Sequence, residues 1–207
     1  MSAQPESSAA GPEGNGGSLT FANHLMLRRI SWAFLFLFAV GLRAESVSLG
    51  EHGSLVLAVP DGWETSSRQA YNPALEKIQS IHLTPKNGAN SLCFITVVFA
   101  AHPKPIDKAA IERQFRTFCE NFVPTSVEKK TNLKELPLSP AYGICATFTD
   151  AKLVGTPPQA GNFKVMTHAM IQFAEEVSAT VIMLTDDEHG AEQHQLMQMV
   201  SAMKLVR

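Results

Sequence analysis

The sequence predicts an α+β fold, in which helices flank a mainly antiparallel β-sheet in an α/β/α layered arrangement. Short apolar segments with the two-residue alternation of strands recur along residues 47–184. Most of them are joined by short turns, and strands joined in this way run antiparallel. Two other segments, residues 106–122 and those after residue 185, carry apolar residues at helical spacing. Because an amphipathic helix must bury its apolar side, we expect both helices to pack on the sheet within one domain.

The overall composition is that of a globular protein. The chain has 207 residues, of which 45% are apolar and 17% are charged, and its formal net charge is -2. A chain of this length can bury a core without metals or disulfides. A near-neutral charge argues against a nucleic-acid partner, since such proteins usually carry a basic surplus. The expected partner is therefore a protein or a small ligand.

The first 25 residues differ in composition from the rest of the chain. Residues 1–25 are rich in Ser, Gly, Ala and Pro and hold few large apolar side chains, so we expect them to be disordered. Signal peptides normally begin at the N-terminus, whereas the signal-like segment described next begins at Met26. Either Met26 is the true start of the protein, or the upstream residues are tolerated.

Residues 26–44 have the layout of a secretory signal peptide, with a pair of arginines, a short apolar run and the small residue Ala44 before a polar stretch. This predicts an exported protein, periplasmic or secreted, whose mature domain is residues 45–207 and keeps no membrane span. The alternative is an uncleaved membrane anchor at residues 30–42. That run has thirteen residues before Arg43 ends it, whereas a spanning helix needs ~20. The length therefore favours a cleaved signal.

The first part of the domain predicts a hairpin, a loop and two strands. Residues 47–49 and 55–59 are short apolar runs that predict a small hairpin. Residues 64–76 are polar with little periodicity and are expected to form a loop. Residues 80–84 alternate and predict a half-buried strand. Residues 92–100 are apolar at almost every position, which predicts a central strand covered on both faces.

The second part predicts three further strands. Residues 142–149 are rich in β-branched and aromatic side chains, and residues 163–174 and 177–184 form two long alternating runs joined by a tight turn. Residues 129–138 are ambiguous and hold either a short strand or none. Residues 151–161 contain several glycines and prolines and are expected to form a loop.

Two segments predict helices. Residues 106–122 begin with Asp107, a good N-cap, and Ile106 and Ile111 are placed as a hydrophobic staple. The second helix is expected to open at Thr185, the first residue of a Thr-Asp-Asp-Glu capping box. The apolar stripes of the two helices are Ile111, Phe115, Phe118 and Phe122, and Leu196, Met199, Val200 and Met203.

Several local sequences, taken together, resemble the PsbP-like superfamily over residues 55–206. The similar features are Val-Pro-Asp-Gly-Trp at residues 59–63, Ile-His-Leu-Thr-Pro at residues 81–85, the mid-chain helix, the late hairpin and Met-Lys-Leu at residues 203–205. The resemblance implies an antiparallel sheet between helices and a role in binding partners rather than in catalysis. The resemblance assigns no functional residue and no cofactor to this chain.

The three cysteines lack the spacing of a zinc site. In an exported protein, Cys93 and Cys145 are candidates for a disulfide, because both fall inside apolar strand runs. Cys119 would then remain a free thiol. Three reduced and buried thiols are the interpretation that we favour, since free cysteine is commonly buried.

Two other side chains are tentative site residues. His168 lies in an alternating strand, on the face of Met166 and Met170, and is either a ligand or base in a pocket or a packed histidine. Trp63 follows a turn and is either a stacking platform for a ligand or an aromatic plug of the core. His189 and His194 are five residues apart on the predicted final helix, so they diverge and predict no metal site.

The sequence contains no nucleophile elbow, phosphate-binding glycine loop or dinucleotide fingerprint. It therefore predicts a non-catalytic binding or accessory protein of the cell envelope, without metal or cofactor. The loops expected at residues 64–76 and 151–161 are the predicted contact surfaces, since binding residues concentrate on long loops. The alternative function is a small exported hydrolase whose site, built from His168 or a cysteine, is assembled only by the fold.

Overall fold

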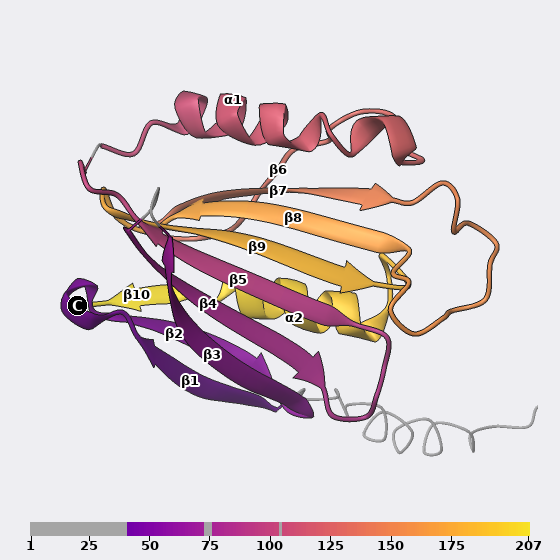
Figure 1. The fold of residues 1–207 in the computed structure, drawn as a ribbon, viewed down its shortest axis with the longest axis horizontal. Coiled ribbons are helices and arrows are strands. Elements are labelled where there is room, and N and C mark those ends of the chain that lie inside the picture. The colour runs from indigo at the N-terminus through magenta and orange to yellow at the C-terminus, as the bar shows by residue number, and fades with distance from the viewer. Residues whose placement is uncertain (1–40, 73–75, 104) are drawn as a thin grey trace, which may run out of the picture. The chain divides into compact units, whose positions relative to one another are not determined.

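The computed structural model describes residues 41–72, 76–103 and 105–207, and Figure 1 shows their arrangement. The predicted disordered extension, residues 1–25, and residues 26–40 of the predicted signal peptide lie outside the described residues. Within the described part no helix is long and apolar enough to cross a membrane.

Two antiparallel sheets make up most of the described chain, which confirms the α+β class. The larger sheet has the order β3-β4-β5-β9-β8-β7-β6, and the smaller has the order β1-β2-β10. The larger sheet comprises β3 (Trp63–Asn72), β4 (Glu76–Pro85), β5 (Leu92–Phe99), β6 (Lys134–Glu135), β7 (Tyr142–Thr149), β8 (Val165–Gln172) and β9 (Val177–Thr185). The smaller sheet comprises β1 (Leu42–Ser48), β2 (Ser54–Pro60) and β10 (Lys204–Val206).

One face of the larger sheet is almost completely buried. Alternate residues of its central strands, including Ile81, Ile95 and Val181, have no exposed surface. They form one apolar cluster with residues of β2 and of helix α2 (Ala191–Ser201). Leu196, Met199, Val200 and Met203 are buried in this cluster, as the sequence predicts. Burial of the alternating apolar set fixes the register, because a one-residue slip would turn every such side chain to solvent.

Helix α1 (Lys108–Cys119) packs on the opposite face, over β7 and β8 (Figure 1). The predicted N-cap is confirmed, since the Asp107 side chain accepts a hydrogen bond from the Ala110 N–H at 3.1 Å. Tyr142 of β7 holds the helix in place by donating its hydroxyl to Glu112 at 3.0 Å. Partial burial and the Glu112 carboxylate raise the pKa of Tyr142 to about 12.

The predicted apolar stripe of this helix is only partly buried. Ile111 and Phe115 are buried, together with Cys119, but Phe118 is 40% exposed. Ile106 is also exposed, so it does not form the buried staple that the sequence suggests. The helix therefore covers the β7–β8 part of this face and leaves apolar side chains at its own border.

The strands away from α1 have an open outer face. Phe94, Thr96 and Val98 of β5 are half-buried, whereas Cys93, Ile95 and Val97 are buried. The prediction that residues 92–100 form a central strand is confirmed, because β5 pairs with both β4 and β9. The prediction that both faces are covered is wrong for the outer face.

The prediction of a loop at residues 64–76 is wrong for the described residues, because β3 extends to Asn72 and β4 begins at Glu76; residues 73–75 lie outside the described residues. Residues 66–69 are exposed on both faces of β3. A stretch of strand with neither face buried has no need of apolar alternation, so the period-two signal is absent there. Backbone pairing with β4, from Trp63 opposite Pro85 to Asn72 opposite Glu76, forms the strand without it.

The helix start predicted at Thr185 is also wrong. Thr185 is the last residue of β9, and α2 begins only after Gly190. The acidic residues instead form the connecting turn, in which Asp187 accepts hydrogen bonds from the backbone N–H groups of His189 and Gly190. Short polar side chains favour both helix caps and turns, and here these residues form a turn.

The remaining strand predictions are confirmed. The hairpin predicted at residues 47–59 is β1–β2, although β1 begins earlier, at Leu42, and β7, β8 and β9 lie where expected. The ambiguous segment holds the two-residue strand β6, and residues 151–161 lie outside helices and strands. No sequence pattern indicates β10, whose three residues pair with β2.

We expect Asp107→Ala to lower the free energy of unfolding by about 1 kcal/mol, because it removes the acceptor for an otherwise unpaired N–H at the start of α1. Asp107→Asn keeps an acceptor at this position and is the matched control. Urea unfolding of both variants measures the difference. Equal stability of the two variants would contradict the capping role.

Candidate functional site

The first tentative residue, His168, lies on β8 beneath α1. Its side chain is 1% exposed, and its ring lies 5.0 Å from that of Phe115 and 4.3 Å from that of Phe118. Its cross-strand neighbours are Ala146 and Ile182. Neither ring nitrogen has a hydrogen-bond partner among the described residues.

These surroundings keep the imidazole neutral. Burial lowers the pKa of His168 to about 4, because the charged form loses its hydration and gains no counter-charge. A general base needs access to a substrate and usually a partner that orients its ring. His168 contacts two phenylalanines and has no such partner within the described residues, so it packs as an aromatic side chain.

The cysteines do not provide a reactive group. Cys93, Cys119 and Cys145 are all buried free thiols. The disulfide considered for Cys93 and Cys145 is not formed, because β9 and β8 separate their strands. Three strand spacings amount to about 14 Å, beyond the roughly 7 Å between Cα atoms that a disulfide spans.

The thiols are also poor nucleophiles. Burial raises the pKa of Cys93 and Cys145 and raises that of Cys119 to about 11, although Arg116 partly opposes the change at Cys119. A cysteine nucleophile needs a lowered pKa, since the thiolate is the reactive form. All three side chains therefore act as small apolar residues.

The second tentative residue, Trp63, is part of the core. It is 3% exposed at the start of β3, and its indole Nε1–H donates to Gln195 Oε1 on α2 at 2.8 Å. This contact joins two elements that are 132 residues apart in the chain. Trp63 thus fixes α2 against the sheet and presents no ring face to a ligand.

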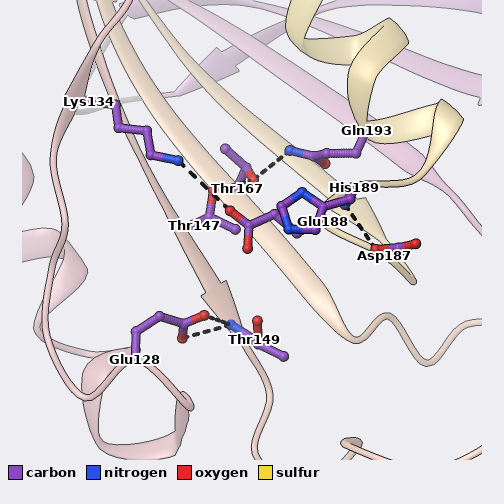
Figure 2. Close-up of polar contacts among 9 residues, drawn as sticks. All are labelled: Glu128, Lys134, Thr147, Thr149, Thr167, Asp187, Glu188, His189 and Gln193. Carbon is purple, nitrogen blue, oxygen red and sulfur yellow. Dashed lines mark hydrogen bonds and ion pairs between the residues drawn. The ribbon is translucent and has the colours of Figure 1, made fainter. Parts of the chain in front are cut away.

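A second polar connection joins α2 to the sheet (Figure 2). Gln193 donates from Nε2 to Thr167 Oγ1 at 2.8 Å, and Thr167 Oγ1 lies 2.9 Å from Thr147 Oγ1. Gln193 Oε1 accepts from the Thr185 hydroxyl at 3.2 Å. A buried polar group is tolerated when its hydrogen bonds are satisfied, so this network is a structural tie.

The polar groups around this network are mostly paired with one another. The Lys134 ammonium lies 3.9 Å from the Glu188 carboxylate (Figure 2). Partial burial would raise the pKa of Glu128, but the hydrogen bonds that its carboxylate accepts from the Thr149 N–H hold this pKa below its usual value.

His189 and His194 are not buried, and no cluster of metal-ligating side chains occurs among the residues that the structure describes.

A cavity of about 230 Å³ opens where β7 and β9 end and β8 begins. We call it the phenylalanine pocket. Its apolar lining is Phe122, Phe148, Phe163, Met166 and Leu184, and its polar rim is Thr125, Ser126, Thr149, Asp150 and Lys164. A mainly apolar concavity with a few polar groups is the usual form of a small-molecule site.

The aromatic wall of this pocket continues beneath α1. The Phe122 ring lies 5.8 Å from that of Phe148 and 5.5 Å from that of Phe118, which in turn packs on His168. Phe122 is held by the turn Val123–Thr125, where its carbonyl accepts from the Thr125 hydroxyl at 3.2 Å. The pocket is therefore supported by packed rings.

The rim has one basic group without an ion-pair partner. Asp150 accepts a hydrogen bond from the Lys152 N–H at 2.8 Å, and the Ser126 hydroxyl donates to the Val123 carbonyl at 3.1 Å. Lys164 makes no ion pair within the described part of the chain. Its ammonium is thus the rim group that is available to an acidic ligand.

The predicted contact loop at residues 151–161 adjoins this rim. Its residues line a second cavity of about 350 Å³ that shares Lys164 with the phenylalanine pocket. Asn90, from the turn before β5, holds the loop by donating to the carbonyls of Gln159 and Asn162 at 3.2 and 3.0 Å. Its side-chain oxygen also accepts from the Gly161 N–H at 3.0 Å.

Sequence reasoning missed Asn90 and Lys164. Asn90 lies about seventy positions from the loop that it holds, so no local pattern reports the contact. Phe122 was expected only as part of the apolar stripe of the first helix, since periodicity identifies an apolar face without showing where its cover ends.

Comparisons of the chain with models of known protein families, with curated proteins and with solved structures found no match.

We expect replacement of His168 to alter the pH dependence of stability. The folded pKa of about 4 lies below the ordinary 6.5, so the unfolded state binds a proton more readily. The contribution of the neutral His168 to the free energy of unfolding is therefore fully present above about pH 6.5. It is lost as the pH falls toward and through 4, by about 3 kcal/mol in total.

His168→Phe should lack this component and should be at least as stable near neutral pH, because no buried nitrogen is left unpaired. The surface variant His194→Gln is the control and should keep the wild-type dependence. Urea unfolding between pH 4 and 8 measures the free energy of unfolding at each pH. If this free energy changed with pH in the same way for His168→Phe and for wild type, His168 would not be the buried neutral group described.

Proposed function

We propose that residues 45–207 are an exported, non-catalytic binding or accessory protein of the cell envelope. The ligand is small, with an aromatic or branched apolar body and an acidic group, and it occupies the phenylalanine pocket. The observation that carries the proposal is this cavity of about 230 Å³, lined by three phenylalanine rings and bordered by Lys164.

The size and chemistry of the pocket select the ligand class. The volume suits a body of one or two rings, since larger ligands need cavities of roughly 300 Å³ or more. Aromatic walls favour a flat apolar body through stacked and edge contacts. Lys164 adds attraction for an acid at the rim, whereas Asp150 disfavours a second negative charge.

The state of the candidate reactive groups supports binding rather than hydrolysis. His168 has no polar partner within the described residues, and burial raises the pKa of the thiols. Hydrolysis by such a side chain requires a nucleophile and a base within hydrogen-bond reach of each other.

The start of β1 is compatible with removal of the signal peptide. Cleavage after Ala44 would remove Leu42, Arg43 and Ala44, which are exposed and pair with the end of β2. The buried side chains Val47 and Leu49 would remain. The core would thus be kept after export.

The layering belongs to the same proposal. We infer a PsbP-like arrangement for the domain, in which the antiparallel sheet lies between helices. Support comes from α1 and α2, which contact apolar clusters on opposite faces of the larger sheet.

We expect the chain to bind naphthalene sulfonate, an aromatic acid, more tightly than neutral naphthol. Lys164→Gln should weaken sulfonate binding about fivefold and leave naphthol binding unchanged, because it removes one partly exposed charge pair. Leu184→Trp should fill the pocket and abolish binding of both compounds. Fluorescence titration gives the dissociation constants.

The matched control is Lys152→Gln, which removes the same charge from an exposed residue that does not line the pocket. It should bind both compounds as wild type does. Unchanged binding by Leu184→Trp would overturn the assignment of the pocket, and an equal effect of both lysine variants would overturn the role of Lys164.

Export is tested separately from ligand binding. We expect protein recovered from the periplasm or the medium to begin at Glu45, which mass spectrometry of its N-terminal peptide would reveal. Replacing Ala44 by Arg should block cleavage, since the position before the cut requires a small side chain. Recovery of the intact chain from the cytosol would overturn the envelope role and leave the pocket assignment standing.

A further inference from the structure

The strand β3 forms one edge of the larger sheet and has a regular, unpaired outer side. It pairs with β4 over ten residues without interruption, from Trp63 to Asn72. No other described strand pairs with it. Residues 66–69 are exposed on both faces, so this part of the strand stands clear of the core, unlike Trp63 at its start.

Its outer side presents backbone groups that pair with no other described strand. The Lys86 N–H donates to the Gly62 carbonyl at 2.7 Å, which makes Gly62 and Lys86 a hydrogen-bonded pair of the β3–β4 ladder. Such pairs alternate along antiparallel strands. The backbone groups of Glu64, Ser66 and Arg68 therefore point toward β4, and those of Thr65 and Ser67 point outward.

The charges of this strand are self-complementary. Glu64 and Arg68 lie on one face, two residues to either side of Ser66. Both are exposed, and neither makes an ion pair with another described residue. An antiparallel copy of the same strand, centred on Ser66, places each carboxylate opposite a guanidinium.

We propose that two copies of this chain pair antiparallel through β3 and so join their larger sheets across a two-fold axis. Ser66 faces Ser66 of the partner subunit at the axis, and Glu64 faces Arg68 of the partner subunit. A two-fold contact repeats every pair, so the interface contains two such charge pairs. Thr65 and Ser67 supply the outward N–H and C=O groups for the new ladder.

The charge pattern selects this register over its neighbours. A two-fold axis at Thr65 or Ser67 leaves both charges without an opposite charge. An axis at Glu64 or at Arg68 places like charges directly opposite, which is destabilising. Only the axis at Ser66 pairs both charges of both copies.

The edge lacks the features that usually prevent such pairing. Proteins protect exposed edges with prolines, bulges, lysines or very short strands. Residues 63–69 contain no proline or lysine, and the register with β4 is continuous. A second copy is the partner whose charges this edge matches.

The test is a charge exchange in the full chain, followed by sedimentation velocity at low salt. Wild type should dimerise, and Glu64→Arg and Arg68→Glu should each weaken dimerisation about tenfold, since each replaces two attractive pairs by two repulsive ones. The double exchange E64R/R68E restores opposite pairs and should restore the dimer. Lys86→Glu changes a charge in the adjoining turn and should dimerise normally.

Mixing the two single variants gives the sharpest result. The Glu64→Arg strand carries two basic side chains at the paired positions, and the Arg68→Glu strand carries two acidic ones. A heterodimer should therefore form although neither variant dimerises well alone. All variants share residues 1–62, so association through those residues would not follow this pattern. A monomeric wild type, or single variants that dimerise as well as wild type and their mixture, would overturn the proposal.

Discussion

The fold depends on the burial of one face of the larger sheet beneath β2 and α2. The apolar residues of that face, such as Ile81, have no exposed surface, and their burial supplies the main favourable term in folding. Because apolar attraction has no direction, polar contacts fix how α2 lies on the sheet. Trp63 bonds to Gln195 near the middle of the helix, and Gln193 bonds to Thr167 nearer its start.

The opposite face follows from this arrangement and is less completely covered. Helix α1 packs over β7 and β8, and the phenylalanines at and just after its C-terminal end are only partly buried. Phe118 lies partly exposed over His168, and Phe122 reaches the strand ends, where it forms one wall of the phenylalanine pocket. The cover that α1 provides thus buries His168, and the end of that cover leaves the phenylalanine pocket.

The sequence identifies elements best where at least one face is buried. Strands β7, β8 and β9 and helix α1 were predicted because at least one face of each meets a core cluster, whereas β3 was missed because both of its faces are exposed around Ser66. The site was less predictable than the fold. His168 was singled out within an alternating strand and Trp63 after a turn, and both prove to be core residues. The pocket is made instead by ordinary residues from separate segments, and Asn90 orders the loop beside it through contacts that no local pattern encodes.

The position of the pocket makes the proposed ligand binding and the proposed dimerisation independent of each other. Its strand residues come from β7, β8 and β9, whereas the free edge is β3, and β4 and β5 lie between them. Pairing through β3 would therefore leave the pocket of each copy open. A dimer would carry two equivalent sites, and neither the Glu64 nor the Arg68 exchange would touch a residue that lines them. Failure of one proposal consequently leaves the physical basis of the other unchanged.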